Sequence, residues 1–141
     1  MSSLITYLER TVRTNRTIAI QMEIQSANHW KDKPDEHDFP AAADYLTLLV
    51  TPVQATKLVK ALRKADLIHR KAKDILRASG LDLLPENNAH VASDLGKARQ
   101  GEKLSPVLLV RGQPLVIADG YHRVCASYWI DEDADIPCRL V

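Results

Sequence analysis

Residues 103–141 read KLSPVLLVRGQPLVIADGYHRVCASYWIDEDADIPCRLV, and this stretch decides the fold. The apolar runs PVLLV at 106–110 and LVIA at 115–118 predict two buried strands joined by a tight turn. A helix is predicted over 121–130, after a glycine that breaks the second strand. IPCRLV at 136–141 predicts a last strand. Because its proline cannot donate a ladder hydrogen bond, we expect this strand at a sheet edge or beginning just after the proline.

Helix signals dominate the sequence before this stretch. Residues 52–65 predict a helix with Thr51 as its N-cap, a proline at the first helical position and Gln54 placed to complete a capping box. Asp66 is placed to cap a second helix that Gly80 ends. One long kinked helix fits the same pattern equally well.

The remaining segments of the C-terminal part complete an α+β pattern. A helix is predicted over 89–100, capped by Asn87 or Asn88. YLTLLV at 45–50 and LDLL at 81–84 predict short strands, since both are short apolar runs. We interpret these strands and helices together as one α+β domain.

The N-terminal part, residues 1–44, is interpreted as an extension. Residues 3–15 predict a short helix and the alternating residues 17–24 a strand. The polar stretch 31–44, with two prolines and several acids, predicts a loop or linker. We therefore divide the chain into an N-terminal extension and loop at 1–44 and a main domain at 45–141.

Composition narrows the class of protein. The chain has 141 residues, of which 45% are hydrophobic and 26% charged, and this matches an ordinary globular domain. The net charge of +1 gives no global attraction to nucleic acid or to membranes. The sequence contains no apolar run long enough to cross a bilayer and no secretory leader pattern, so we expect a cytoplasmic protein with no membrane partner. Cys125 and Cys138 are expected to be free thiols.

The chemistry concentrates in the turn 119–123, which reads Asp119-Gly120-Tyr121-His122-Arg123. Gly120 permits a sharp turn and a close ligand. The free N–H groups and the dipole of a helix start favour an anion, and Arg123 suits two-point capture of a phosphate. Asp119 is the candidate catalytic residue, as a general base or as a ligand of a metal on a polyphosphate. A plain helix cap with solvated His and Arg side chains is the alternative.

With its surroundings, this turn resembles the phosphate motif of the ParB/sulfiredoxin-like nucleotide-binding domain. Members place a Gly-His-Arg or Gly-Glu-Arg-Arg motif at a helix start, between a hairpin and a final strand. The resemblance covers residues 81–141 well and 45–80 by element order only. It implies a small mixed sheet packed with helices, and a phosphate held by Gly120, His122 and Arg123.

Two departures limit what the resemblance implies. Tyr121 stands where sulfiredoxins have their catalytic cysteine, so we expect no ATP-dependent reduction of a sulfinylated peroxiredoxin. His122 replaces one basic position of the Gly-Glu-Arg-Arg motif, so the cytidine-triphosphate clamp chemistry of the partition-type members is not carried over.

The family also uses polar residues on the preceding helix. Their equivalents here are His90, Ser93 and Lys97, which share one helical face, although a solvated face explains them equally well.

These observations predict that the turn, Tyr121 included, binds a nucleotide or another phosphate-bearing small molecule. The expected cofactor is ATP or another nucleoside triphosphate with Mg²⁺. If the protein is an enzyme, we expect an NTP-dependent phosphotransferase or an NTPase. A metal site held by protein ligands has little support, because His29, His37 and His69 are scattered.

The alternative function is a non-catalytic nucleic-acid or protein-binding module that uses the basic helices at 52–79. Eight basic residues lie in this segment against Asp66 and Asp74: Lys57, Lys60, Arg63, Lys64, Arg70, Lys71, Lys73 and Arg77. A solvated helix face explains the same charges. The segment also lacks the interleaved aromatic residues on which nucleic-acid bases would stack.

Overall fold

The computed structural model describes residues 29–141, so the predictions for 3–15 and 17–24 lie outside the described residues. The described part is α+β, as predicted. Its elements follow in the order α2 (Asp38–Leu46), α3 (Pro52–Lys64), β1 (Ile68–Lys71), α4 (Ala72–Ser79), α5 (Ala89–Arg99), β2 (Val107–Val110), β3 (Val116–Asp119), α6 (Tyr121–Ile130) and β4 (Asp135–Leu140). None of the helices within 29–141 is long and apolar enough to cross a membrane.

The four strands of the described chain form one mixed sheet in the order β1-β4-β2-β3. β4 runs parallel to β2, while the β1–β4 and β2–β3 pairs are antiparallel. The expectation of an edge position for the last strand is wrong, because β4 lies between β1 and β2. The backbone N–H of Val141 donates to Leu109 O on β2. Alternate residues of a strand direct their N–H groups to the same side, so the position of Pro137, which has no N–H, also faces β2. Pairing with β2 starts only at Cys138, so the proline interrupts no ladder bond there.

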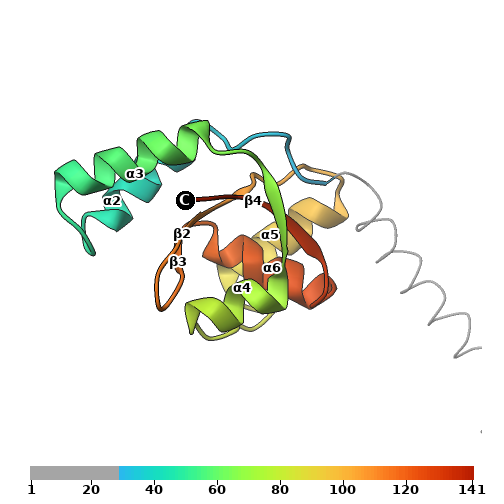
Figure 1. Cartoon of the computed structure of the whole chain (residues 1–141). Helices are drawn as coiled ribbons and strands as arrows, with labels where there is room; N and C mark the ends of the chain where they lie inside the picture. Colours follow the sequence, from blue (N-terminus) through green and yellow to red (C-terminus); the bar gives the residue numbers. More distant parts are fainter. Residues whose placement is uncertain (1–28) are drawn as a thin grey trace, which may run out of the picture.

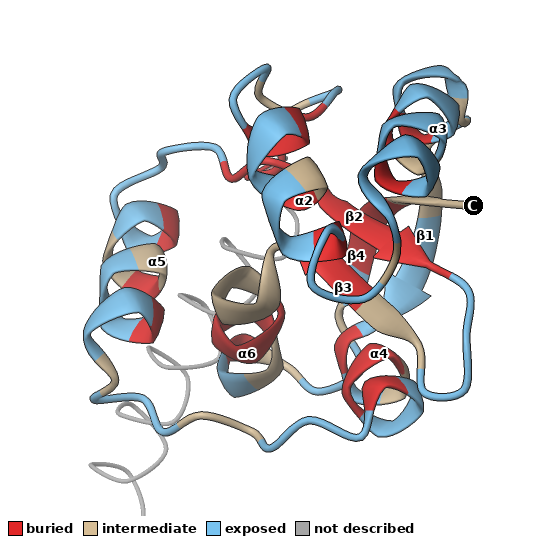
Figure 2. Cartoon of the chain, turned by 90° about the vertical axis from the view of Figure 1, so that its left-hand side faces the viewer, coloured by how far each residue is buried: buried red, intermediate tan, exposed pale blue. Residues whose placement is uncertain are grey.

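Helices cover both faces of this sheet (Figure 1). Successive residues of β2 point to opposite faces: Val107 and Leu109 join the core beneath α4, α5 and α6, whereas Leu108 and Val110 join the core beneath α2 and α3. All four residues of β2 are buried, which explains its unbroken apolar run. Figure 2 shows the same arrangement, with the buried sides of the helices turned inward.

The prediction of a loop over 31–44 is wrong from residue 38 onward, and the predicted strand at 45–50 is wrong as well. Helix α2 occupies Asp38–Leu46, and the division at residue 44 falls inside it. Phe39, Ala42 and Leu46 recur at helical spacing and are buried against the sheet. The proline at 40 lies in the first turn, where no intrahelical N–H bond is lost.

The start of α3 confirms its sequence signals. The Thr51 side chain accepts a hydrogen bond from Gln54 N, and the Gln54 side chain accepts one from Thr51 N. This reciprocal pair satisfies two N–H groups that the helix itself leaves without partners.

We therefore expect Thr51→Ala to lower the free energy of unfolding by about 1 kcal/mol, the usual cost of a lost N-cap. Urea unfolding followed by circular dichroism measures this change. Thr56→Ala is the matched control, since Thr56 lies on the same helix and its hydroxyl only donates back to Pro52 O. An equal loss in both variants would contradict the role given to the cap.

The middle of the chain departs from prediction in three places. Strand β1 separates α3 from α4, so the alternative of one kinked helix is wrong. Asp66 does not cap α4 as predicted, because this helix begins only after β1 and its N-cap is Lys71. Gly80 ends α4 at φ 67°, as predicted, and the Asn88 side chain caps α5. Residues 81–84 form no strand. Their backbone is instead held by side chains of α6, because Trp129 Nε1 donates to Leu84 O at 2.7 Å.

Candidate functional site

The predicted turn lies where β3 ends and α6 begins. Gly120 is the N-cap of α6, with φ 113° and ψ 16°, and no side chain caps the helix. The interpretation of Asp119 as the helix cap is therefore wrong. The first-turn N–H groups have no intrahelical acceptors by the geometry of an α-helix, so this helix start keeps its donors available to a ligand.

Glycine is required at position 120 for two reasons. Its φ lies in a region that L side chains rarely adopt. A Cβ there would also lie 2.9 Å from Val107 Cγ2 and 3.0 Å from the Arg123 guanidinium. The space left by the missing side chain is therefore what allows Arg123 to pack directly against the turn.

Arg123 is largely buried and bound to two carboxylates. Its guanidinium lies 3.1 Å from Asp119 Oδ2 and 3.4 Å from Asp38 Oδ2, and its side chain is only 16% exposed. It also donates to Pro106 O at 3.4 Å. The solvated Arg side chain of the helix-cap alternative is therefore wrong, because this Arg links α6 to β3 and α2.

The two carboxylates that contact Arg123 have different surroundings. Asp38 also accepts a hydrogen bond from the Ser105 hydroxyl, and its side chain is 6% exposed. Burial raises the pKa of Asp119, and the nearby Asp38 raises it further, while the Arg123 guanidinium acts in the opposite direction. Asp119 is therefore the group of the cluster that takes up a proton more readily than an ordinary Asp.

Two imidazoles meet beside the same turn. The rings of His90 on α5 and His122 on α6 lie 4.7 Å apart between centroids. Asp94, one turn after His90, is half-buried next to them. Burial raises its pKa, whereas Arg123, Lys97, His122 and His90 lower it. The structure thus brings His90 to the predicted site. Lys97 is close enough to Asp94 to act on its carboxyl electrostatically.

The other sequence candidates differ in their surroundings. Ser93 is exposed on α5, and its hydroxyl makes no hydrogen bond within residues 29–141. The Tyr121 hydroxyl donates to Asp82 O, and its ring lies against His122 with centroids 5.7 Å apart. Cys125 and Cys138 are free, as expected, and fully buried. Burial raises the pKa of the Cys125 thiol, which disfavours the thiolate needed of a nucleophile.

Sequence reasoning missed Asp38 and Asp94. Asp94 lies four residues after His90, so helical spacing alone places it on the same face. No local pattern identifies Asp38, which is 85 residues from its partner Arg123.

A group of potential metal ligands adjoins the site but has protein partners. Ligand atoms of Asp35, His37 and Asp38 lie within 4.8 Å of one another. Asp35 is already paired with Lys31 at 2.6 Å, and Asp38 with Arg123. Each of the two carboxylates therefore already has a cationic side chain as its partner.

No protein-family model matches this chain, and neither the curated proteins nor the solved structures contain a significant match.

Proposed function

We propose that the start of α6 binds a phosphate group of a nucleotide or of another phosphate-bearing small molecule. The observation that carries this proposal is a helix start with no side-chain cap, opened by Gly120 and flanked by His122 and His90. Such a start offers backbone N–H donors and the positive end of the helix dipole. The resemblance of the 119–123 motif to ParB/sulfiredoxin-like domains agrees with this choice of ligand.

Arg123 has a structural role in addition to the phosphate contact that the motif suggests. Because two carboxylates already bind its guanidinium, it holds the turn in place and supplies positive charge beneath it. Nη2 makes all of these contacts, whereas Nε has no hydrogen-bond partner among the described residues, so the guanidinium keeps donor capacity for a phosphate. Burial raises the pKa of Asp119, so this carboxyl takes up a proton more readily than an ordinary Asp. This makes Asp119 the proposed acid–base group of any phosphate transfer or hydrolysis.

The proposed cofactor is ATP or another nucleoside triphosphate. Its phosphates suit the N–H donors and imidazoles of the turn. Asp119, the carboxylate within the turn, accepts a hydrogen bond from Arg123. The site therefore does not favour a Mg²⁺ ion held by the protein, and any Mg²⁺ would accompany the nucleotide on its own phosphates.

A thermal-shift panel of nucleoside mono-, di- and triphosphates, with and without Mg²⁺, tests the proposal. A ligand at 100 times its dissociation constant stabilises the folded state by about 2.7 kcal/mol. We expect stabilisation by at least one nucleotide, and its reduction in His122→Gln. If no nucleotide stabilises the parent protein, or if His122→Gln responds as the parent does, the assignment is wrong.

The affinity for a phosphate ligand is expected to rise as pH falls from 8 toward 6. Burial lowers the pKa of His122, as do His90 and Arg123, while Asp94 acts in the opposite direction. The pKa of His122 therefore lies below the ordinary histidine value of about 6.5. The imidazole is neutral at pH 8 and gains its charge only at lower pH. Uptake of one proton on binding strengthens affinity by at most about tenfold per pH unit.

Calorimetric titration at several pH values measures this trend. His122→Gln is the control, since protonation of the ligand itself affects both proteins equally. Identical pH profiles in the two proteins would show that His122 does not contact the phosphate.

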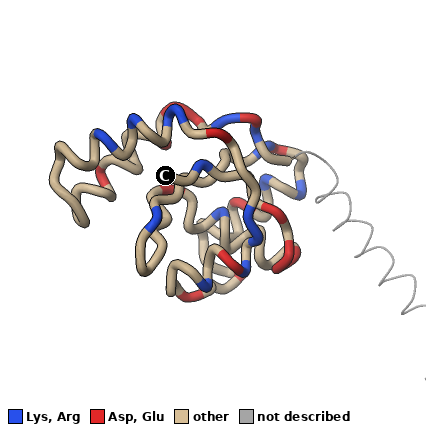
Figure 3. The backbone as a smooth tube through the Cα atoms, in the orientation of Figure 1, with Lys and Arg blue, Asp and Glu red and all other residues tan. Residues whose placement is uncertain are grey.

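The alternative, a binding module built on the basic helices, has one observation in its favour. Lys57, Lys60 and Lys64 are exposed along α3, where Figure 3 shows a series of basic positions. Other basic residues of 57–77 are already paired: Arg63 with Glu36, Lys73 with Asp133 and Arg77 with Asp74. A salt-sensitive gel shift with nonspecific DNA that is lost when the three lysines are changed to Glu would favour this module.

A further inference from the structure

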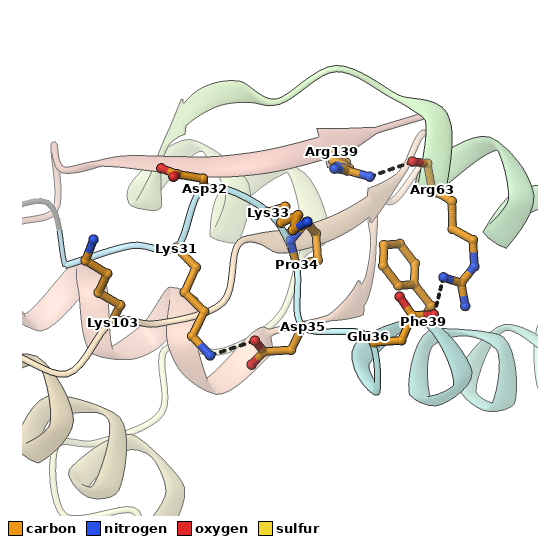
Figure 4. A pocket seen from close by; sticks show the side chains of 10 residues that line it. All are labelled: Lys31, Asp32, Lys33, Pro34, Asp35, Glu36, Phe39, Arg63, Lys103 and Arg139. Atoms are coloured by element: carbon orange, nitrogen blue, oxygen red, sulfur yellow. Dashed lines mark hydrogen bonds and ion pairs between the residues drawn. The ribbon is translucent and has the colours of Figure 1, made fainter.

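A second candidate site lies on the face of the sheet that α2 and α3 cover. A cavity of about 700 Å³ is bordered by the segment 31–36, the end of α3, β4 and Lys103 (Figure 4). Its volume is within the range of small-molecule sites, roughly 300–1,000 Å³. Nothing in the proposed function of the α6 turn uses these residues.

Positive charge dominates the wall of this cavity. Its basic residues outnumber its acidic ones, with Lys31, Lys33, Arg63, Lys103 and Arg139 against Asp32, Asp35 and Glu36. Lys31 is neutralised by Asp35, and Arg63 by Glu36. Among the ion pairs of residues 29–141, none involves Lys33, Lys103 or Arg139. Three cations therefore remain for a ligand against the single carboxylate of Asp32.

Arg139 is held in place before any ligand arrives. Its Nη1 donates to Arg63 O at 2.7 Å and to Leu62 O at 3.2 Å, at the C-terminal end of α3. Its Nε is buried and has no hydrogen-bond partner. Carbonyl partners fix the guanidinium without cancelling its charge, so the cavity contains a positioned cation with donor capacity left over.

We propose that this cavity binds a small, multiply charged anion, such as a phosphate ester or a polycarboxylate, through Arg139, Lys33 and Lys103. With Asp32 counted, the three cations leave a net charge of +2, so a ligand with two negative charges matches the wall. The two lysines are exposed and adjust to the ligand, whereas Arg139 fixes its position.

Backbone amide NMR shifts under titration with inorganic pyrophosphate, and separately with citrate, test this proposal. We expect saturable shifts at residues 31–36, Lys103 and Arg139. The double variant Lys33→Glu/Lys103→Glu is expected to weaken binding about tenfold or more, because two charge-assisted contacts become repulsive. A matched control, Lys57→Glu/Lys60→Glu, makes the same charge change on residues that do not line the cavity.

The two anions distinguish phosphate recognition from carboxylate recognition. A response to either one, lost in the first double variant and kept in the control, supports the site. The absence of saturable shifts at these residues would overturn it, and so would an equal loss in both double variants, which indicates general charge attraction. His122→Gln should weaken binding at the α6 turn and leave the shifts at Lys103 and Arg139 unchanged, so this variant separates the result from the proposal for that turn.

Discussion

Arg123→Ala is expected to lower the free energy of unfolding by about 3–5 kcal/mol, because it leaves two buried carboxylates without their cation. Asp38 and Asp119 both contact this guanidinium, and all three side chains are largely buried. Urea unfolding of the variant measures the difference.

The loss is expected to depend on pH in a defined direction. Burial and Asp38 already raise the pKa of Asp119, and Arg123 is the group that opposes them. Without Arg123, the folded state binds a proton at a higher pH than the unfolded state does. A group of this kind contributes stability that disappears as pH rises. The deficit should therefore be smaller near pH 5 than at pH 8.

Two further variants separate charge from packing. Arg123→Lys keeps a cation and should lose less stability than Arg123→Ala. Adding Asp119→Asn to Arg123→Ala should recover part of the loss, because one of the unpaired carboxylates is removed. If Arg123→Ala unfolds like the parent protein at pH 8, the buried cluster has no structural role.

Gly120→Val is expected to be comparably damaging, at about 2–6 kcal/mol. A β-branched residue at φ 113° is strained, at a cost of about 1–3 kcal/mol. Its Cβ would also overlap Val107 at 2.9 Å, and overpacking of this kind costs about 1–3 kcal/mol. Displacement of the Arg123 guanidinium and of the turn should also abolish phosphate binding.

Gly96→Ala is the matched control for this change. Gly96 lies within α5, and a Cβ there meets nothing within 4 Å. Alanine should stabilise that position by about 0.5–1 kcal/mol. A Gly120→Val protein that is as stable as the Gly96→Ala control and still binds a nucleotide would show that the turn needs no glycine.

Local signals explain which elements could be predicted from sequence. Thr51 and Gln54 fix the start of α3, Gly80 fixes the end of α4 and Asn88 caps α5, all within a few residues of chain. The buried runs of β2 and β3 and the glycine before α6 are equally local. Each of these patterns depends on backbone geometry that neighbouring residues determine by themselves.

The elements that sequence reasoning missed depend on contacts across the chain. Helix α2 has a proline in its first turn and several polar residues, and it is stabilised by packing of Phe39 and Leu46 against the sheet. Strand β1 has exposed, polar residues and forms by pairing with β4. The same limit applies to the site, where Asp38 contacts Arg123 from a helix that the sequence did not predict.

The most direct test of the proposed phosphate site is an NMR titration of the full chain with ATP, in which the backbone amides of Tyr121, His122 and Arg123 are followed. These N–H groups form the first turn of α6, so a bound phosphate should shift them in a saturable way, together with the imidazole signals of His122 and His90. Amides along the outer face of α3 should stay unchanged. Saturable binding of ATP that leaves the amide chemical shifts of residues 121–123 unchanged would contradict the central claim.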